Sequence, residues 1–125
     1  MIKGLHHNAY RCRDSEETRR FYEDFLGLRL AGALEITETK TGRQTHVLHT
    51  FYEMGDGSYL AFFDVPDQPF EFKQQHDYDL HIALEVDRET LERMYAKARP
   101  RAAKSVVWWI TASSIRSIFA IPTAT

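Results

Sequence analysis

The order of apolar and polar residues predicts one strand and one helix at the start of the chain. Residues 5–13, LHHNAYRCR, alternate loosely between apolar and polar side chains, which is typical of a strand. Asp14 and Glu17 have the spacing of a capping box, so a helix is expected to begin there and to end at Gly27. The apolar residues that share one face of this helix are Phe21, Tyr22, Phe25 and Leu26.

Strand patterns follow the helix, and turn signals separate them. The patterns are LRLAGALEITET, THVLHTFYEM and SYLAFFDV, with turns at KTGRQ and GDG, and Pro66 and Pro69 end the last of them. The first half of the chain therefore predicts the order strand, helix, strand, strand, strand. We assign residues 1–66 to this first module and the polar residues 67–78 to a linker.

The same pattern then begins again, which indicates an internal repeat and a second module at residues 79–125. DLHIALEVD is a strand pattern whose Ile82, Leu84 and Val86 share one face. Asp87 is placed to cap a helix over RETLERMYAKA. The residues on one side of that helix are Leu91, Met94, Tyr95 and Ala98.

A histidine takes the same place in the first strand of each module. Aligning His81 with His7 also brings Ala83 onto Ala9. A single strand histidine more often has a structural role, but two histidines related by a repeat can meet in a shared cavity, where imidazole nitrogens suit a divalent transition metal. His81 lies opposite the apolar face of its strand, so we expect it to point away from the helix and toward that cavity.

Composition and charge fit a single globular domain and narrow the possible partners. The chain has 125 residues, of which 43% are hydrophobic and 27% charged. With 16 basic and 18 acidic residues its net charge is -2, which favours neither nucleic acid nor an anionic membrane as a partner. The sequence contains no apolar run long enough to span a bilayer, and MIKGLHHNAY lacks the features of a signal peptide, so we expect a cytoplasmic protein. Cys12 is the one cysteine and is interpreted as structural.

These stretches resemble the vicinal oxygen chelate superfamily, which includes glyoxalase I, extradiol ring-cleavage dioxygenases, fosfomycin-resistance proteins and bleomycin-resistance binding proteins. The resemblance covers residues 2–98 and rests on LHHNAYRCRDSEETRRFYEDFLGL, SYLAFFDVP and DLHIALEVD. It implies an α+β fold in which paired βαβββ modules surround a cupped sheet that binds one metal ion. It also implies that His7 and His81 bind this ion, whereas His6 lies on the opposite face of its strand.

The further metal ligand that this family adds to the histidines is missing. The glyoxalase-type branch has a carboxylate or amide on the fourth strand, often within LELF, and here LAFF puts Ala61 at that position. The extradiol branch needs a glutamate from the last strand, usually within a motif like FRDPNGYVIEL. The final residues, ASSIRSIFAIPTAT, contain no carboxylate.

A neighbouring reading frame can encode the missing motif. The codons of residues 120–125, shifted by one base, allow DPNGY, and WWITASSIRSIFAIPTAT can in the same way conceal VDHGFIDSIYFRDPNGY. A match of this length is improbable by chance. We therefore expect residues 99–125 to be out of frame, with the slip near AKARPRAAKS, and the second module to be incomplete. An authentic divergent tail is the alternative.

Other side chains could serve the site, and each has an ordinary structural alternative. His49 and Glu53 share a face of the third strand and could act as acid or base toward the cup, or they could be ordinary strand residues. Tyr59 and Phe63 share a face of the fourth strand and could line an aromatic substrate pocket or pack in the core. The histidines to which no role is assigned are His46 and His76.

The resemblance implies a divalent-metal-dependent enzyme that acts on a small oxygenated molecule. An extradiol-type dioxygenase with two histidines and one carboxylate is the expected activity, with Fe(II) or Mn(II) as the metal and Zn or Ni as alternatives. Two other functions remain open: a glyoxalase I-like lyase or isomerase, and a metal-free small-molecule binding or resistance module. The resemblance further implies a homodimer.

Overall fold

The computed structural model describes residues 1–72, 76, 78–79, 82–98 and 118–122, the last five by backbone alone. The chain divides into two compact units, Met1–Glu71 and Phe72–Thr125.

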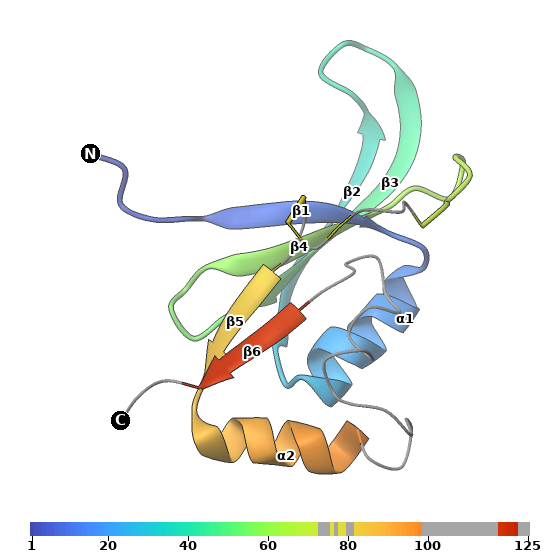
Figure 1. The fold of residues 1–125 in the computed structure, drawn as a ribbon. Coiled ribbons are helices and arrows are strands. Elements are labelled where there is room, and N and C mark those ends of the chain that lie inside the picture. Colours follow the sequence, from blue (N-terminus) through green and yellow to red (C-terminus); the bar gives the residue numbers. More distant parts are fainter. Residues whose placement is uncertain (73–75, 77, 80–81, 99–117, 123–125) are drawn as a thin grey trace. The chain divides into compact units, whose positions relative to one another are not determined.

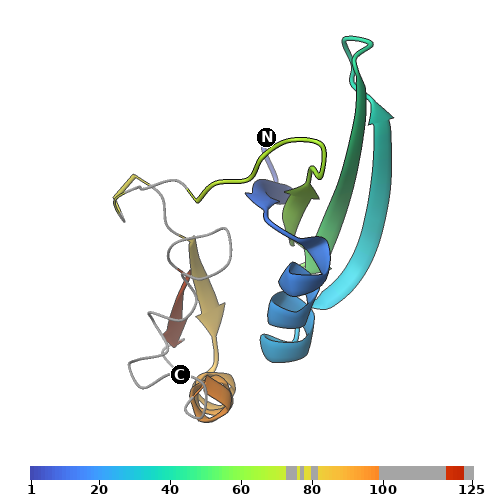
Figure 2. The same ribbon diagram turned by 90° about the vertical axis from the view of Figure 1, so that its right-hand side faces the viewer.

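Unit 1 is a four-stranded sheet with a helical segment on one face (Figures 1 and 2). The strands are β1 (His7–Cys12), β2 (Arg29–Glu38), β3 (Gln44–Glu53) and β4 (Tyr59–Asp64), and their order across the sheet is β1-β4-β3-β2. β1 and β4 run parallel, whereas β4 pairs antiparallel with β3 and β3 with β2. The predicted order of one strand, one helix and three strands is thus confirmed for the first half of the chain.

The helical segment begins as the sequence predicts. α1 (Ser15–Arg19) continues directly into η1 (Arg20–Phe25), which is a π-helical turn that the sequence did not indicate. The Asp14 carboxylate caps the first turn by accepting a hydrogen bond from the Glu17 N–H at 2.7 Å. The Glu17 carboxylate instead pairs with Arg13, so the return bond of a capping box is replaced by an ion pair. Gly27 follows the last turn with φ +82°, a left-handed conformation that favours glycine.

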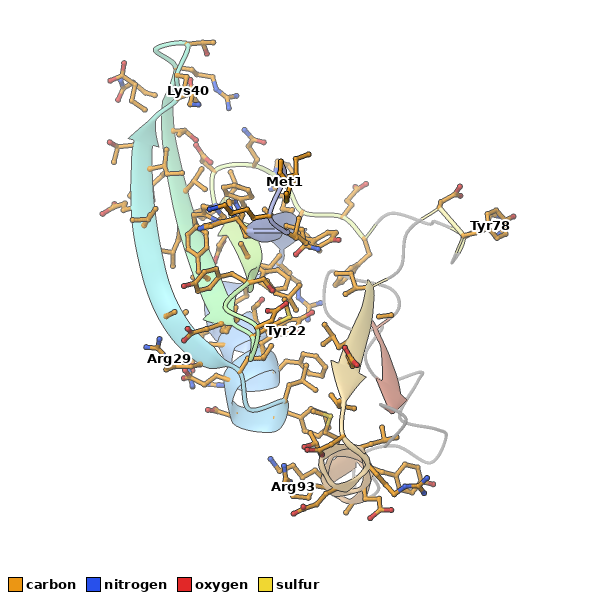
Figure 3. All side chains as sticks on the ribbon, turned by 90° about the vertical axis from the view of Figure 1, so that its left-hand side faces the viewer. Met1, Tyr22, Arg29, Lys40, Tyr78 and Arg93 are labelled. Atoms are coloured by element: carbon orange, nitrogen blue, oxygen red, sulfur yellow. The ribbon has the colours of Figure 1, made fainter. Side chains whose placement is uncertain are left out.

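The core of unit 1 lies between this helical segment and the sheet. Tyr22, on the helix, is fully buried, and its ring centre lies 5.6 Å from Tyr52 on β3 and 4.6 Å from Phe62 on β4. Figure 3 labels Tyr22 at this interface. Burying each such large side chain contributes about 1.5–3 kcal/mol. The predicted inward face of the helix is therefore correct, and its buried members are Phe21, Tyr22 and Phe25.

Two strands and one helix are described in unit 2. These are β5 (Ile82–Val86), α2 (Arg88–Ala98) and β6 (Ile118–Pro122). Asp87 caps α2 as predicted, because its carboxylate accepts a hydrogen bond from the Thr90 N–H at 2.7 Å. β5 and β6 run parallel, which matches the parallel pairing of β1 and β4 in unit 1. The strand–helix order at the start of the predicted second module is thus confirmed.

One side of α2 is less buried than the sequence suggests. Leu91 and Met94 are partly covered and Ala98 is buried, but Tyr95 is 49% exposed. An out-of-frame tail would leave Trp108 and Trp109 partly exposed, but both residues lie outside the described part of the chain.

Candidate functional site

The face of the unit 1 sheet that carries no helix, here called the helix-free face, holds most of the residues singled out from the sequence. Strand alternation separates it from the helix-covered face, to which Tyr10, Tyr52 and Phe62 belong through their ring contacts. The residues concerned lie on three of the four strands. They are His7, Ala9 and Arg11 of β1, His49, Phe51 and Glu53 of β3, and Tyr59, Ala61 and Phe63 of β4.

His7 and His49 approach each other across β4. Their ring centres are 6.0 Å apart, although β1 and β3 both pair with β4 and not with each other. Strands two positions apart are separated by roughly 9–10 Å, so these side chains must lean over the intervening strand. Ala61 of β4 pairs with Ala9 and Phe51 and is fully buried, and its methyl group leaves this path open.

Contacts on several sides fix the His49 imidazole. The side chain is only 7% exposed, and its Nδ1 lies 3.0 Å from the Phe62 carbonyl oxygen. A carbonyl can only accept, so the Nδ1–H donates and Nε2 keeps its lone pair in the neutral ring. The Phe63 ring stacks on His49 at 3.9 Å and 13°, and the Phe51 ring contacts it at 4.2 Å and 52°.

His6 lies closer to His7 than strand alternation predicts. β1 begins at His7, so His6 precedes the strand and does not follow its alternation. The two Nδ1 atoms are 2.7 Å apart, and the His6 ring also contacts Tyr59 at 5.6 Å between centres. The expectation that His6 is on the opposite face from His7 is therefore wrong, because the residue is outside the regular strand.

Glu53 and His46, by contrast, contact charged side chains of β2. Arg29, directly opposite on β2, donates to the Glu53 carboxylate from Nε at 2.9 Å and also from a terminal guanidinium nitrogen. His46 lies 3.5 Å from the Glu35 carboxylate and points to the other face of the hairpin. Glu53 thus shares a face with His49 but has a cation partner of its own.

Tyr59 and Phe63, the two aromatic residues predicted to line a substrate pocket, have different neighbours. The Tyr59 ring contacts His6 and Phe51, whereas the Phe63 ring stacks on His49. Both side chains are partly exposed. Phe51, which sequence reasoning missed, contacts His7, His49 and Tyr59, and its place between His49 and Glu53 in the strand alternation was sufficient to find it.

The side chains described in the structure do not form a complete metal centre. No group of three histidine, cysteine or carboxylate side chains that could hold a metal ion occurs among them, and His81 lies outside the described residues. Ala61 is the residue at which the resemblance leads us to expect a carboxylate or amide. Phe119 takes the corresponding register position in unit 2, since Ala83 pairs with Phe119 as Ala9 pairs with Ala61. The β6 sequence, IFAIP, contains no metal ligand. The described residues thus do not present a set of two histidines and one carboxylate.

A shallow cavity of about 500 Å³ in unit 1 was not foreseen from the sequence. It lies where β1 and β4 end, and Arg11 closes one wall by donating to the carbonyl oxygens of Val65 at 3.3 Å and Gln68 at 2.6 Å. The Arg11 guanidinium also lies 5.8 Å from the Phe70 ring centre. Arg11 thus holds the segment after β4 against β1, which is a long-range contact that no local pattern signals.

Burial shifts the pKa of two groups on the helix-covered face. It raises the pKa of the Cys12 thiol from an ordinary value of 9.0 to about 11, with a smaller opposing effect of a hydrogen bond with Thr18. Burial likewise raises the pKa of Tyr52 to about 12. Cys12 is 2% exposed, so its interpretation as a structural residue agrees with both its burial and its protonated thiol.

No helix in the described part of the chain is long and apolar enough to cross a membrane.

Comparison with known proteins relates this arrangement to one family. The sequence model of the Glyoxalase/Bleomycin resistance protein/Dioxygenase superfamily matches residues 4–107. A search of curated proteins found no match.

Solved structures of low sequence identity share the fold. A glyoxalase/dioxygenase from Nostoc punctiforme is 21% identical with a TM-score of 0.54, over 78% of this chain and 69% of its own. Fosfomycin resistance protein FosX from Mesorhizobium loti is 20% identical with a TM-score of 0.50, over 80% of this chain and 70% of its own. FosX from Listeria monocytogenes, solved as a mutant with Mn(II) and 1S,2S-dihydroxypropylphosphonic acid, is 18% identical with a TM-score of 0.53, over 80% of this chain and 70% of its own.

Proposed function

Because the chain belongs to the Glyoxalase/Bleomycin resistance protein/Dioxygenase superfamily, we propose that it derives from a divalent-metal-dependent enzyme that acts on a small oxygenated substrate. The observation that carries the proposal is the pair of imidazoles on the helix-free face, His7 and His49, whose ring centres are 6.0 Å apart. An extradiol-type dioxygenase is the activity that fits this pair best. One histidine can serve as a ligand there while the other handles a proton of a diol substrate.

In this proposal His7 and His81 hold the ion, and Fe(II) or Mn(II) is the expected metal. A carboxylate ligand would favour Fe(II) or Mn(II), whereas imidazole ligands alone suit Zn and Ni well. Neither Ala61 nor any residue of β6 supplies this carboxylate. The complete site is therefore proposed for the protein in the restored reading frame, and for the chain as written we derive no reaction step at the metal.

His49 is proposed as the acid or base of the reaction. Its Nδ1–H is committed to the Phe62 carbonyl, so Nε2 is the atom that would accept or return a proton. Glu53 was predicted for the same role, but its ion pair with Arg29 supports a lesser one, in which the carboxylate helps to fix the end of β3. Tyr59 and Phe51 expose ring surface on the helix-free face and are proposed to contact the substrate.

We further propose that residues 99–125 are out of frame. The match to the family ends at residue 107, shortly after the predicted slip near AKARPRAAKS, and the neighbouring frame can encode the family's missing motif. Resequencing the gene across the codons for residues 95–105 tests this directly. An inserted or deleted base there supports the proposal, and an unchanged sequence favours the divergent tail.

A metal-free binding module is the second candidate, and the helix-free face gives it specific support. Aromatic rings of this face contact one another in a continuous series from Tyr59 through Phe51 to His49 and Phe63, which is a surface suited to a flat apolar ligand. The alanine at the carboxylate position also agrees with a protein that needs no metal. A glyoxalase I-like lyase or isomerase is less well supported, because it requires a ligand where Ala61 stands.

Assays of the chain with a restored tail separate these candidates. Oxygen consumption with a catechol supports the dioxygenase, and turnover of a glutathione hemithioacetal supports the lyase. Binding of an aromatic ligand without retained metal supports the binding module. A cytoplasmic location remains a proposal. A homodimer is also a proposal, which rests on the family resemblance, and sedimentation analysis tests it.

A further inference from the structure

Two residues of β4 that lie near His49 have a structural role that the family resemblance does not assign. We propose that Phe63 is a positioning residue for the His49 imidazole and that Ala61 leaves the space in which this imidazole reaches His7. The inference rests on the proposed role of His49 as acid or base. It also revises the part that Phe63 was expected to take as a wall of the substrate pocket.

A single hydrogen bond does not fix the plane of the His49 ring. The bond from Nδ1 to the Phe62 carbonyl selects the tautomer, but a carbonyl oxygen accepts over a broad range of directions. The torsion that turns an imidazole about its last side-chain bond also has broad minima. A second contact is therefore needed to hold Nε2 in one direction.

Phe63 provides this contact because it stands directly opposite His49 in the β3–β4 register. The two rings are nearly parallel, at 13°, with centres 3.9 Å apart, so rotation of the imidazole would drive its edge into the phenyl ring. Phe51 is almost as close but tilted by 52°, and it also contacts His7. Phe63 alone among these rings lies flat on the imidazole, and its covered face cannot stack on a substrate.

Ala61 acts by its size. It lies two residues before Phe63 on β4 and therefore projects to the same helix-free face, between β1 and β3. The His7 and His49 rings approach to 6.0 Å over this position. A larger side chain at residue 61 would occupy the space between the two rings and separate them.

Imidazole nitrogen signals in the full-length chain test the proposal without any activity assay. In a ¹⁵N-labelled protein the two His49 nitrogens, assigned with the His49→Gln variant, should give separate signals for a protonated Nδ1 and an unprotonated Nε2. Phe63→Leu keeps apolar volume but removes the flat ring. The imidazole can then turn away from the Phe62 carbonyl that selects its tautomer, so the two signals should come together as the tautomers exchange. It should also abolish the upfield displacement of the His49 ring protons that a stacked phenyl ring causes.

Phe63→Tyr and Tyr59→Leu are the matched variants. The first keeps a flat ring against His49 and should retain the wild-type signals. The second removes a ring on the same strand and face whose described ring contacts are with His6 and Phe51, and it should also leave these signals unchanged. Ala61→Leu should shift the His7 and His49 ring-proton signals, because it separates their rings. Melting temperatures of all variants identify any that are unfolded.

Opposite results would overturn the inference. If folded Phe63→Leu keeps separate nitrogen signals and the upfield ring protons, Phe63 does not position His49. If Phe63→Tyr loses them, stacking is not the cause. These outcomes are independent of the proposed function: failure of the restored chain to consume oxygen would reject the dioxygenase while leaving a positive result on Phe63 intact.

Discussion

The imidazoles of His7 and His49 lie 6.0 Å apart although their strands are separated by β4. The sequence distance between them is large, and the pairing of both β1 and β3 with β4 brings them together. Both residues belong to unit 1, so this part of the candidate site depends on one module. The integrity of the unit 1 sheet is therefore the first requirement for any chemistry on its helix-free face.

Ala61→Leu is expected to destabilise the protein, whereas Ala9→Leu is not. The two alanines pair across β1 and β4, but Ala61 is fully buried and Ala9 is exposed. Added atoms at the buried position should cost about 1–3 kcal/mol in the free energy of unfolding. The exposed position should change it by less than about 0.5 kcal/mol. Urea denaturation of both variants measures these changes. A free energy of unfolding that falls no more for Ala61→Leu than for Ala9→Leu would show that Ala61 is less tightly packed than described.

Tyr22→Ala should be among the most damaging substitutions in unit 1. The Tyr22 ring is fully buried against Tyr52 and Phe62, so its removal leaves a large cavity that should cost about 3–5 kcal/mol. Tyr78→Ala serves as the control, because Tyr78 is 82% exposed. Thermal unfolding followed by circular dichroism compares the two. A control as damaging as Tyr22→Ala would contradict the assignment of the core.

Loss of the Asp14 cap should weaken the start of the helix. Asp14→Ala removes the acceptor for the Glu17 N–H and is expected to lower the free energy of unfolding by about 0.5–2 kcal/mol. Asp14→Asn keeps a capping oxygen and should recover most of the loss. Asp67→Ala, at an exposed position, should have almost no effect. Denaturant titrations of the three variants provide the measurement.

The buried Cys12 thiol predicts both low reactivity and an alkaline loss of stability. Its pKa is about 11 in the folded chain and 9.0 ordinarily, so the unfolded chain releases the proton first. The contribution of Cys12 to stability is thus complete below pH 9.0 and declines as the pH rises toward 11. Denaturant titrations at several pH values should show a smaller alkaline decline for Cys12→Ala. Rapid alkylation of native Cys12 at pH 8 would contradict its burial.

Much of the unit 1 fold could be predicted from local sequence patterns. Asp14, Gly27 and the prolines after β4 mark the ends of elements through their own backbone chemistry, and the structure has the ends close to these residues. The π-helical turn was not predictable in this way. It depends on how Phe21, Tyr22 and Phe25 pack on the sheet, which is a tertiary effect.

The candidate site was only partly readable from the sequence. The alternation of β3 puts His49 on the same face as Glu53, but it could not show that Arg29 engages Glu53 or that Phe63 stacks on His49. Those contacts depend on the register between neighbouring strands. The position of His6 was misjudged because the alternation argument assumed a strand over residues 5–13, whereas β1 begins at His7.

Metal retention by the chain with a restored C-terminal frame tests the central claim most directly. The protein, loaded anaerobically with Fe(II) or with Mn(II) and then freed of excess metal, should retain the ion in a stoichiometric amount by elemental analysis. The His7→Gln variant should lose the metal ion. The His46→Gln variant should retain it, because the His46 side chain lies on the surface beside Glu35. A folded, restored protein that retains no metal above background would contradict the claim that this chain derives from a metal-dependent enzyme.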